Sequence, residues 1–442
     1  MQNENCAVCE CGRIHNTVNV KVYTECGAIQ RLPHILRELG SKKPFLLSDC
    51  NTRRAAGEQV EKILLESGIS YSQHSFSKSP APDERAVGSA VMHFDTDCDA
   101  VIGIGSGVIN DIGKLLSRTA NLPYIIVATA PSMDGYASSS SSMERQGLKI
   151  SLPSKCADVI VGDLDILAES PLYLRLSGLG DMLAKYIGIC EWRIASLVVG
   201  EDYCENIAQM IRSALKTCID NADGLLSGDR DSVRAVFDGL VTAGMAMTYA
   251  NSSRPASGME HYISHVWDMR ALEFGTSSST HGYQCAVATV IASGIYHDLL
   301  SYTPDHQKAA DAFRGFTYES YKKQLRALLG NGAETMIALE ENKERKYTRG
   351  RFDTHLQAIL KHWEAIKEII RQEIPSQEYL VRLLKKLGAP SSPEELGIAT
   401  DNLPEVFEAT RDIRDKYVLS RLVFDLGLTE TVKEKLKARN PL

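Results

Sequence analysis

The 442-residue sequence lacks the features that mark membrane, secreted and nucleic-acid-binding proteins. It has no run of about 18 uncharged apolar residues, so no membrane span is expected. The first residues, MQNENCAVCECGRIH, lack the apolar core of a secretory signal, and a cytoplasmic location is expected. Because the net charge is -7, a nucleic-acid partner has no electrostatic support, and an anionic substrate needs a local cluster of donors.

Paired cysteines of a disulfide framework are also missing. The eleven cysteines are an odd number, and most stand singly in apolar segments such as YIGICEW, which favours reduced thiols. One group is denser, with Cys6, Cys9 and Cys11 followed by His15. This spacing allows a zinc knuckle, but structural zinc usually uses two well-separated ligand pairs. The alternative is a reduced N-terminal arm without a metal.

The first 165 residues alternate short apolar runs with helical patterns. Helices are expected at 28–40 and 55–68, each ended by glycine. Strand alternating with helix predicts a parallel sheet that is covered on both faces. The segment 148–167, LKISLPSKCADVIVGDLDIL, is interpreted as a hairpin that closes this half. The expected strands are residues 18–23, 44–48, 99–105 and 124–129.

From about residue 166 the apolar spacing is helical throughout, for example at 204–222, 232–250 and 317–329. The chain is long enough for two domains, each with its own core. The sequence therefore predicts an α/β domain over residues 1–165 and an all-helical domain over residues 166–442. The active site is expected in a cleft between them.

A glycine-rich turn follows the expected strand at 99–105. Gly103, Gly105 and Gly107 precede a helix that opens near Val108, where backbone amides can approach an anion. The order is not the G-x-G-x-x-G of the dinucleotide fingerprint, and a tight turn without a ligand is the alternative. The next strand ends in ATAPSMDGYASSSS, a loop of small hydroxyl residues. Two adjacent loops at the carboxyl ends of parallel strands favour a ligand there.

Three of the eleven histidines lie within residues 258–282. His261 and His265 are one helical turn apart, and His281 stands at the start of a strongly apolar helix. Two or three imidazoles with one carboxylate suit Zn²⁺, Ni²⁺ or Fe²⁺, and Asp181 in a glycine-rich turn offers the carboxylate. Each histidine taken alone is more often a core or surface residue than a ligand.

Five segments in this order, GIGSGVINDIGK, ATAPSMDGYAS, GLGDMLAKY, SRPASGMEHYISH and THGYQ, resemble the motifs of a known superfamily. They look like those of the iron-dependent alcohol dehydrogenase-like proteins, most closely the bacterial glycerol-1-phosphate dehydrogenases. The resemblance runs from about residue 18 to residue 300. It implies a dehydrogenase with a nicotinamide dinucleotide, NAD(H) or NADP(H), and one divalent metal ion.

The resemblance also implies roles for individual residues. Asp181, His261 and His281 match the metal ligands, His265 lines the substrate side, and Asp134 contacts substrate hydroxyls. Many iron-dependent members carry a fourth ligand, a histidine, four residues after the aspartate, where this sequence has Lys185. This departure favours a three-ligand site with nickel or zinc over one with iron. The residues that match the cofactor site are Gly105, Ser106, Gly107, Asp111, Thr129, Ser132 and Ser138.

The implied reaction is reduction of dihydroxyacetone phosphate to sn-glycerol 1-phosphate, with His265 relaying a proton to the alkoxide. The alternatives are a glycerol dehydrogenase, a lyase similar to 3-dehydroquinate synthase, and a nucleotide-binding protein without activity. Relatives favour a homodimer.

Two further assignments concern charged groups. Asp49 ends a strand, where its carboxylate can accept a hydrogen bond from an adenosine ribose, which favours NAD; the alternative is that Asp49 caps a helix. Arg53 and Arg54 follow closely and could bind the 2′-phosphate of NADP. Arg254, on an expected loop just before His261, is the candidate for the substrate phosphate, and Lys185 competes with it. The alternative for Arg254 is an ion pair with a surface carboxylate.

Overall fold

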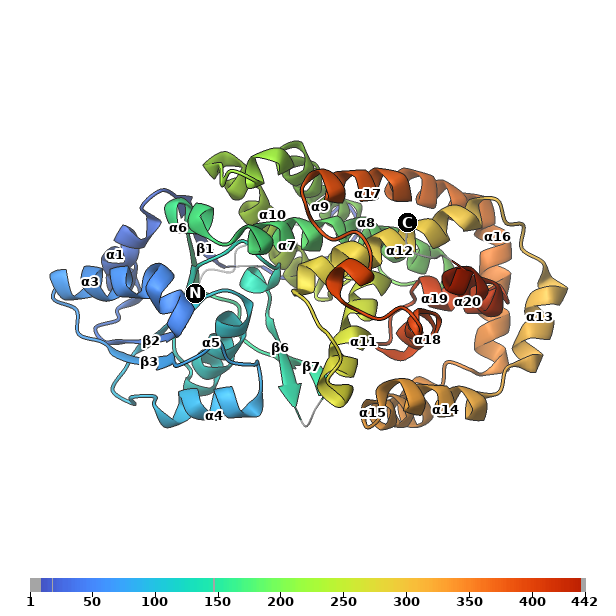
Figure 1. Ribbon diagram of the computed structural model, residues 1–442, viewed down its shortest axis with the longest axis horizontal. Coiled ribbons are helices and arrows are strands. Elements are labelled where there is room, and N and C mark those ends of the chain that lie inside the picture. Colours follow the sequence, from blue (N-terminus) through green and yellow to red (C-terminus); the bar gives the residue numbers. More distant parts are fainter. Residues whose placement is uncertain (1–8, 18, 146–147, 439–442) are drawn as a thin grey trace. The chain divides into compact units, whose positions relative to one another are not determined.

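The computed structural model describes residues 9–438 except residues 18 and 146–147 (Figure 1). Cys6 and Val18 therefore lie outside the described residues. The chain forms two compact units. The first comprises Met1–Met182 and Gln209–Ser253, and the second comprises Leu183–Ala208 and Arg254–Leu442.

This division differs from the expected boundary after residue 165. Helix α10 (Arg230–Ala250) belongs to the first unit because its Phe237 packs against the sheet. A Cβ at Gly162 of β8 (Val159–Asp163) would lie 2.3 Å from the Phe237 ring. The centres of the Tyr136 and Phe237 rings are 5.4 Å apart. Apolar spacing predicts such a helix but not the surface against which it packs.

The core of the first unit is a six-stranded sheet in the order β1-β8-β5-β4-β2-β3. Every neighbouring pair is parallel. The central strands β4, β5 and β8 are buried along their whole length, as expected for parallel strands covered on both faces. The bounds are β1 (Lys21–Glu25), β2 (Pro44–Asp49), β3 (Ser72–Phe76), β4 (Ala100–Gly105), β5 (Tyr124–Ala128) and β8 (Val159–Asp163).

Two strand assignments differ from the sequence interpretation. The hairpin predicted over 148–167 is wrong, because β7 (Leu148–Pro153) pairs antiparallel with β6 (Ser140–Arg145) and β8 enters the main sheet. The β6–β7 hairpin stands apart from that sheet (Figure 1). Strand β3 was not expected, because only Phe76 of its sequence SQHSF is buried and it lies at the edge of the sheet.

Helices cover both faces of the sheet. On one face α1, α3 and α6 contribute to a core with Leu46, Ile102 and Val127. On the other face, the space of Gly103 is taken by Tyr124. The helices of this unit are α1 (Leu32–Leu39), α2 (Cys50–Thr52), α3 (Glu58–Glu66), α4 (Glu84–Met92), α5 (Gly107–Ala120), α6 (Leu164–Glu169) and α10, with short turns η1 (Ala28–Arg31), η2 (Arg53–Gly57), η3 (Gly135–Ala137) and η4 (Ala222–Leu225).

The described residues of the second unit form helices joined by loops and no strand, as the apolar spacing predicts. Its larger core includes Trp267, Ile291 and Phe407, and a smaller one includes Ala309 and Phe352. Helices α7 (Leu172–Leu183) and α9 (Glu205–Asp220) contain division points between the units. The second unit has α8 (Lys185–Val198), α11 (Met259–Phe274), α12 (His281–Leu300), α13 (His306–Gly315), α14 (Tyr318–Leu329), α15 (Gly332–Leu339), η5 (Glu340–Glu344), α16 (Arg349–Glu373), α17 (Gln377–Lys386), η6 (Glu394–Leu396), α18 (Leu403–Ala409), η7 (Thr410–Asp412), α19 (Leu419–Asp425) and α20 (Thr429–Ala438).

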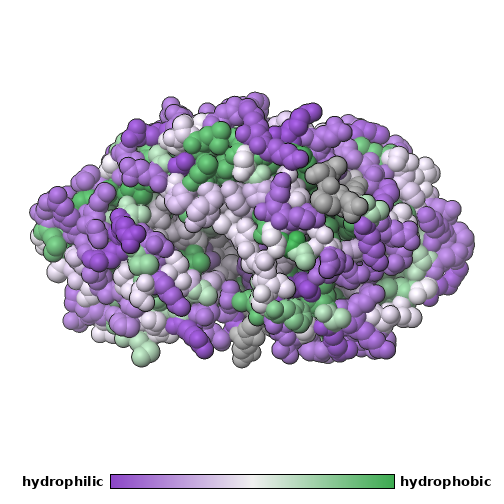
Figure 2. All heavy atoms as spheres, in the orientation of Figure 1, coloured by the Kyte–Doolittle hydropathy of each residue, from purple (hydrophilic) through white to green (hydrophobic). Residues whose placement is uncertain are grey.

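Apolar side chains are mostly inside. On the face shown in Figure 2, hydrophilic residues prevail and apolar ones form small separate groups. Among the described residues, no helix combines the length and the hydropathy that crossing a membrane requires.

Candidate functional site

The turn between β4 and α5 contains three of the predicted cofactor residues, Gly105, Ser106 and Gly107. The first hydrogen bond of α5 runs from the amide of Asn110 to the carbonyl of Ser106 (2.9 Å). The three amides before Asn110 therefore have no carbonyl one turn back within the helix. Such amides, at the positive end of a helix of 14 residues, attract anions.

The reason for glycine differs among the three glycine positions of this turn. A Cβ at Gly103 would lie 2.4 Å from the Tyr124 hydroxyl, and one at Gly105 would lie 2.6 Å from Ile109 Cβ. The protein's own packing therefore requires these two glycines. A Cβ at Gly107 would meet ordinary contacts only, the nearest at 3.4 Å. A tight turn without a ligand thus accounts for Gly103 and Gly105 but not for Gly107.

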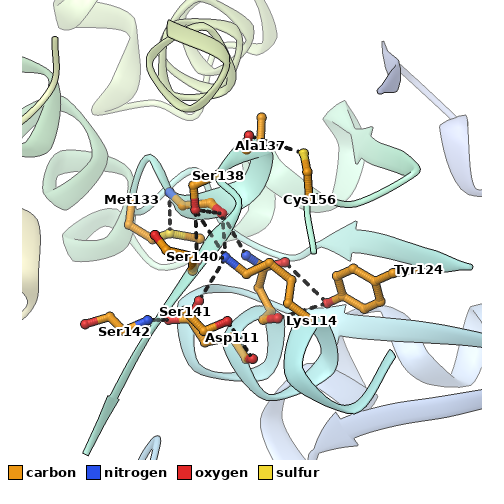
Figure 3. A network of polar contacts seen from close by, with 12 residues as sticks. Asp111, Lys114, Tyr124, Met133, Ala137, Ser138, Ser140, Ser141, Ser142 and Cys156 are labelled. Carbon is orange, nitrogen blue, oxygen red and sulfur yellow. Dashed lines mark hydrogen bonds and ion pairs between the residues drawn. The ribbon is translucent and has the colours of Figure 1, made fainter. Parts of the chain in front are cut away.

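Lys114 anchors the serine-rich loop that follows β5 (Figure 3). Its side chain is completely buried, and its Nζ forms an ion pair with Asp111 Oδ1 at 3.0 Å. Burial raises the pKa of Asp111, and the charge of Lys114 opposes that rise. The Nζ also donates to Gly135 O (3.1 Å), Ser138 Oγ (3.2 Å) and Ser140 O (2.5 Å). Lys114 therefore links two predicted cofactor residues, Asp111 and Ser138, in one network.

The other predicted cofactor residues lie at the same edge of the sheet. Asp49 ends β2, next to β4, and its carboxylate caps α2 by accepting from the amides of Asn51 (2.8 Å) and Thr52 (2.9 Å). The helix-capping alternative for Asp49 is therefore realised. Thr129 follows β5 directly, Ser132 lies three residues further along the same loop, and both are buried.

Two carboxylates lie together in the first unit. Asp181 is completely buried on α7, and its Oδ2 accepts a hydrogen bond from the amide of Asp134 (2.9 Å). Their carboxylate oxygens lie within 4.8 Å of one another. Gly178, one turn before Asp181, permits this approach, because a Cβ there would lie 1.8 Å from Pro131 O. The glycine-rich motif thus brings the helix onto the loop after β5.

The three histidines lie together in the second unit. His261 and His265 are on α11, and His281 is the first residue of α12. The His281 ring is 5.0 Å from that of His261 and 6.2 Å from that of His265, between ring centres. Cys285, one turn after His281, brings its sulfur 3.6 Å from His281 Nε2. One donor atom each of His261, His281 and Cys285 lies within 4.8 Å of the other two.

Hydrogen bonds select the tautomers of two of these histidines. The Gln284 amide nitrogen faces three oxygen atoms at 3.0–3.3 Å, so its Oε1 accepts the Ser264 hydroxyl (2.6 Å). Ser264 Oγ then accepts from His281 Nδ1 (3.1 Å), and Glu260 Oε1 accepts from His261 Nδ1 (2.7 Å). Both imidazoles therefore present Nε2 as a lone pair, and with a carboxylate or thiolate they suit a borderline divalent ion.

Two buried carboxylates support the start of α11. Glu260 Oε1 accepts from the amide of Gly258 (2.8 Å), and Glu191 Oε2 accepts from the amide of Met259 (3.0 Å). Burial raises the pKa of both carboxyl groups, and the charge of Glu260 raises that of Glu191 further. Lys185, which is completely buried on α8, opposes the rise at Glu260.

Arg254 lies in the expected turn before α11, but its side chain is buried, and the alternative of an ion pair with a carboxylate is what the structure shows. Its side chain is 1% exposed, and its Nε donates to Glu201 Oε1 at 2.6 Å. Its Nη2 pairs with Glu201 Oε2, and its Nη1 donates to the carbonyl of Tyr417 (2.9 Å). All three guanidinium nitrogens are thus used within the second unit. In the sequence, Pro255 indicates that a helix ends near this point. It does not indicate that the Arg254 side chain is buried.

Several residues of the site were missed by the sequence interpretation. Cys285 carries a local signal, because it stands four residues after His281 on an apolar helix. Lys114, Glu260 and Ser264 carry none, because each acts on partners that only the fold brings near.

The first unit is a parallel α/β sheet with helix amides at its carboxyl edge, and the second is a helical unit that carries a histidine cluster. Residues 23–171 match the sequence model of the family described as iron-containing alcohol dehydrogenase. The chain is 26% identical over 416 residues to a protein of Halalkalibacterium halodurans named glycerol-1-phosphate dehydrogenase (NAD(P)+), covering 93% of this chain and 94% of that one.

A protein of the same name from Methanosarcina acetivorans is 32% identical over 266 residues, 60% of this chain and 73% of its own length. The crystal structure of maleylacetate reductase from Agrobacterium tumefaciens has the same fold, with a TM-score of 0.62 at 14% identity. It covers 97% of this chain and 99% of that chain. The chain belongs to the glycerol-1-phosphate dehydrogenases within the iron-containing alcohol dehydrogenase family, which confirms the resemblance in its motifs.

Proposed function

We propose that this protein reduces dihydroxyacetone phosphate to sn-glycerol 1-phosphate with NADH or NADPH and one divalent metal ion. The proposed metal ligands are Asp181, His261 and His281. One observation carries the proposal: in a member of this family, His261 and His281 are locked so that both present Nε2. These residues would hold a divalent ion, nickel or zinc, which would supply Lewis-acid chemistry to the substrate carbonyl.

The residues around the ligands have proposed roles of their own. His265, half-buried beside His281, delivers the proton to the product oxygen, because an imidazole titrates near neutral pH. Asp134 accepts a hydrogen bond from a substrate hydroxyl. Lys185 remains the candidate for the substrate phosphate, and Arg254 is left out because Glu201 and Tyr417 occupy it.

The cofactor is proposed to bind along the carboxyl edge of the sheet, where its nicotinamide supplies the hydride. The amides that open α5, beside the small residue Gly107, would hold the pyrophosphate, and Ser138 would contact the nicotinamide end of the cofactor. The site residues proposed are Gly105, Ser106, Gly107, Asp111, Thr129, Ser132 and Ser138, with Asp49 for the ribose.

The preference for NADH or NADPH depends on whether an arginine near Asp49 is available to bind the 2′-phosphate of NADPH. Arg53 donates from Nε and Nη2 to Glu61 (2.7 and 2.9 Å), which leaves Arg54 as the remaining candidate for a 2′-phosphate. Replacing Arg54 by glutamine is expected to weaken NADPH binding and to leave NADH binding unchanged.

The proposal is tested by following NADH oxidation with dihydroxyacetone phosphate and, separately, with dihydroxyacetone. The metal-free protein is expected to be inactive, and added Ni²⁺ or Zn²⁺ is expected to restore turnover of the phosphorylated substrate. Preference for unphosphorylated dihydroxyacetone points instead to a glycerol dehydrogenase. Metal binding without oxidation of NADH on either substrate contradicts the proposal and favours a lyase or a protein without activity.

A further inference from the structure

A tight turn at the N-terminal end of the described chain places two cysteines side by side. The amide of Cys9 donates to Arg13 O (2.8 Å), and the amide of Gly12 donates to Cys9 O (2.7 Å). Gly12 has φ of 82°, and a Cβ added there would meet nothing within 4 Å, so its backbone conformation and not packing calls for glycine. Cys9 and Cys11 therefore belong to one small, hydrogen-bonded loop.

His15 closes this loop through a defined tautomer. Its Nδ1 lies 3.2 Å from the carbonyl of Tyr249, near the end of α10. A carbonyl only accepts, so Nδ1 carries the proton and Nε2 is a lone pair. That Nε2 lies 3.3 Å from Cys11 Sγ. A backbone carbonyl that orients a histidine in this way is the usual second partner of a metal-bound imidazole.

The three donors lie close enough together to surround one ion. The sulfur atoms of Cys9 and Cys11 and a ring nitrogen of His15 lie within 4.8 Å of one another. Ligands of tetrahedral zinc, about 2.3 Å from the ion for sulfur and about 2.0–2.1 Å for nitrogen, lie roughly 3.6–3.8 Å apart. We propose that Cys9, Cys11 and His15 bind a structural zinc ion, distinct from the metal proposed for the reaction.

The donor set and the location give the ion its role. Two thiolates and one imidazole select zinc over hard cations such as Mg²⁺ or Ca²⁺. Through His15 and Tyr249, the ion fastens the N-terminal segment to the end of α10, which packs on the sheet by Phe237. Structural zinc takes four ligands, so one further donor completes the site.

Metal analysis of the full-length protein separates this ion from the catalytic one. The zinc-loaded protein is expected to hold two equivalents after dialysis. Cys9→Ser, Cys11→Ser and His15→Ala are each expected to lose one equivalent and to keep the other. His281→Ala is expected to lose the other equivalent only. Cys26→Ser, at an exposed cysteine, is the matched control and is expected to keep both.

Two further measurements guard against loss of folding in the variants. A mercurial thiol reagent added to the unsubstituted protein is expected to release the zinc that His281→Ala retains. Serine substitution of each other cysteine in turn, with zinc content as the readout, identifies the fourth ligand. If Cys11→Ser and His15→Ala both hold as much zinc as the unsubstituted protein, the loop is joined by a thiol–imidazole hydrogen bond alone and the proposal is overturned.

Discussion

Ser264 is the residue through which the fold sets the tautomer of His281. Its hydroxyl donates to Gln284 Oε1 (2.6 Å) and its oxygen accepts from His281 Nδ1 (3.1 Å). Ser264→Ala removes both contacts without changing a proposed ligand. Partners of this kind usually contribute 10- to 100-fold to metal affinity, which corresponds to about 1.4–2.8 kcal/mol. We therefore expect the zinc dissociation constant to rise about 10- to 100-fold.

This zinc dissociation constant is measured by titrating the metal-free protein with zinc in competition with a chelator. The relevant zinc ion is the one that His281→Ala is expected to lose. Ser293→Ala is the control, because Ser293 is equally buried on α12 but donates to Pro375 O (2.7 Å). Both variants are expected to lose roughly 1–2 kcal/mol of unfolding free energy. Only Ser264→Ala is expected to lose zinc affinity. Equal zinc affinity in the two variants refutes the reasoning that this hydroxyl orients a ligand.

Three other substitutions test separate parts of the structure. Gly178→Ala forces a Cβ against Pro131 O and is expected to destabilise the fold by about 1–3 kcal/mol in urea unfolding; Gly88→Ala, with open space at its Cβ, is expected to be neutral or stabilising. Lys114→Met removes the cation from the half-buried Asp111 carboxylate, which keeps only the Ser142 amide, and is expected to destabilise the fold by about 3 kcal/mol and to weaken NADH binding; unchanged values count against the network. His265→Ala is expected to keep the metal and to lower kcat by roughly 10²–10⁴-fold, and a metal-free variant makes His265 a ligand.

Local patterns were sufficient for much of the fold. Strands β2, β4 and β5 follow from continuous apolar runs, because central parallel strands bury both faces. The spacing of His261 and His265 on one face of α11 follows from the helical period alone. The motifs themselves sufficed to identify the family, since the order of five short segments is a property of the sequence.

Partners distant in the chain were decided by the tertiary structure. Nothing near β7 and β8 says that β7 pairs with β6 while β8 lies between β1 and β5, because apolar runs do not encode their neighbours. The edge strand β3 shows the same limit, since one buried side chain gives no alternation to detect.

The charged residues show why the site needs the fold most. Pro255 predicts a break before α11, but only packing brings Glu201 to Arg254 and buries the guanidinium. Ser264 and Gln284 are ordinary polar residues in the sequence, and they select the tautomer of His281 only because α11 and α12 lie side by side. The sequence by itself determined which residue types are available for the chemistry. Their protonation, burial and partners were decided by contacts across the chain, because a hydrogen bond depends on distance in space and not on separation in sequence.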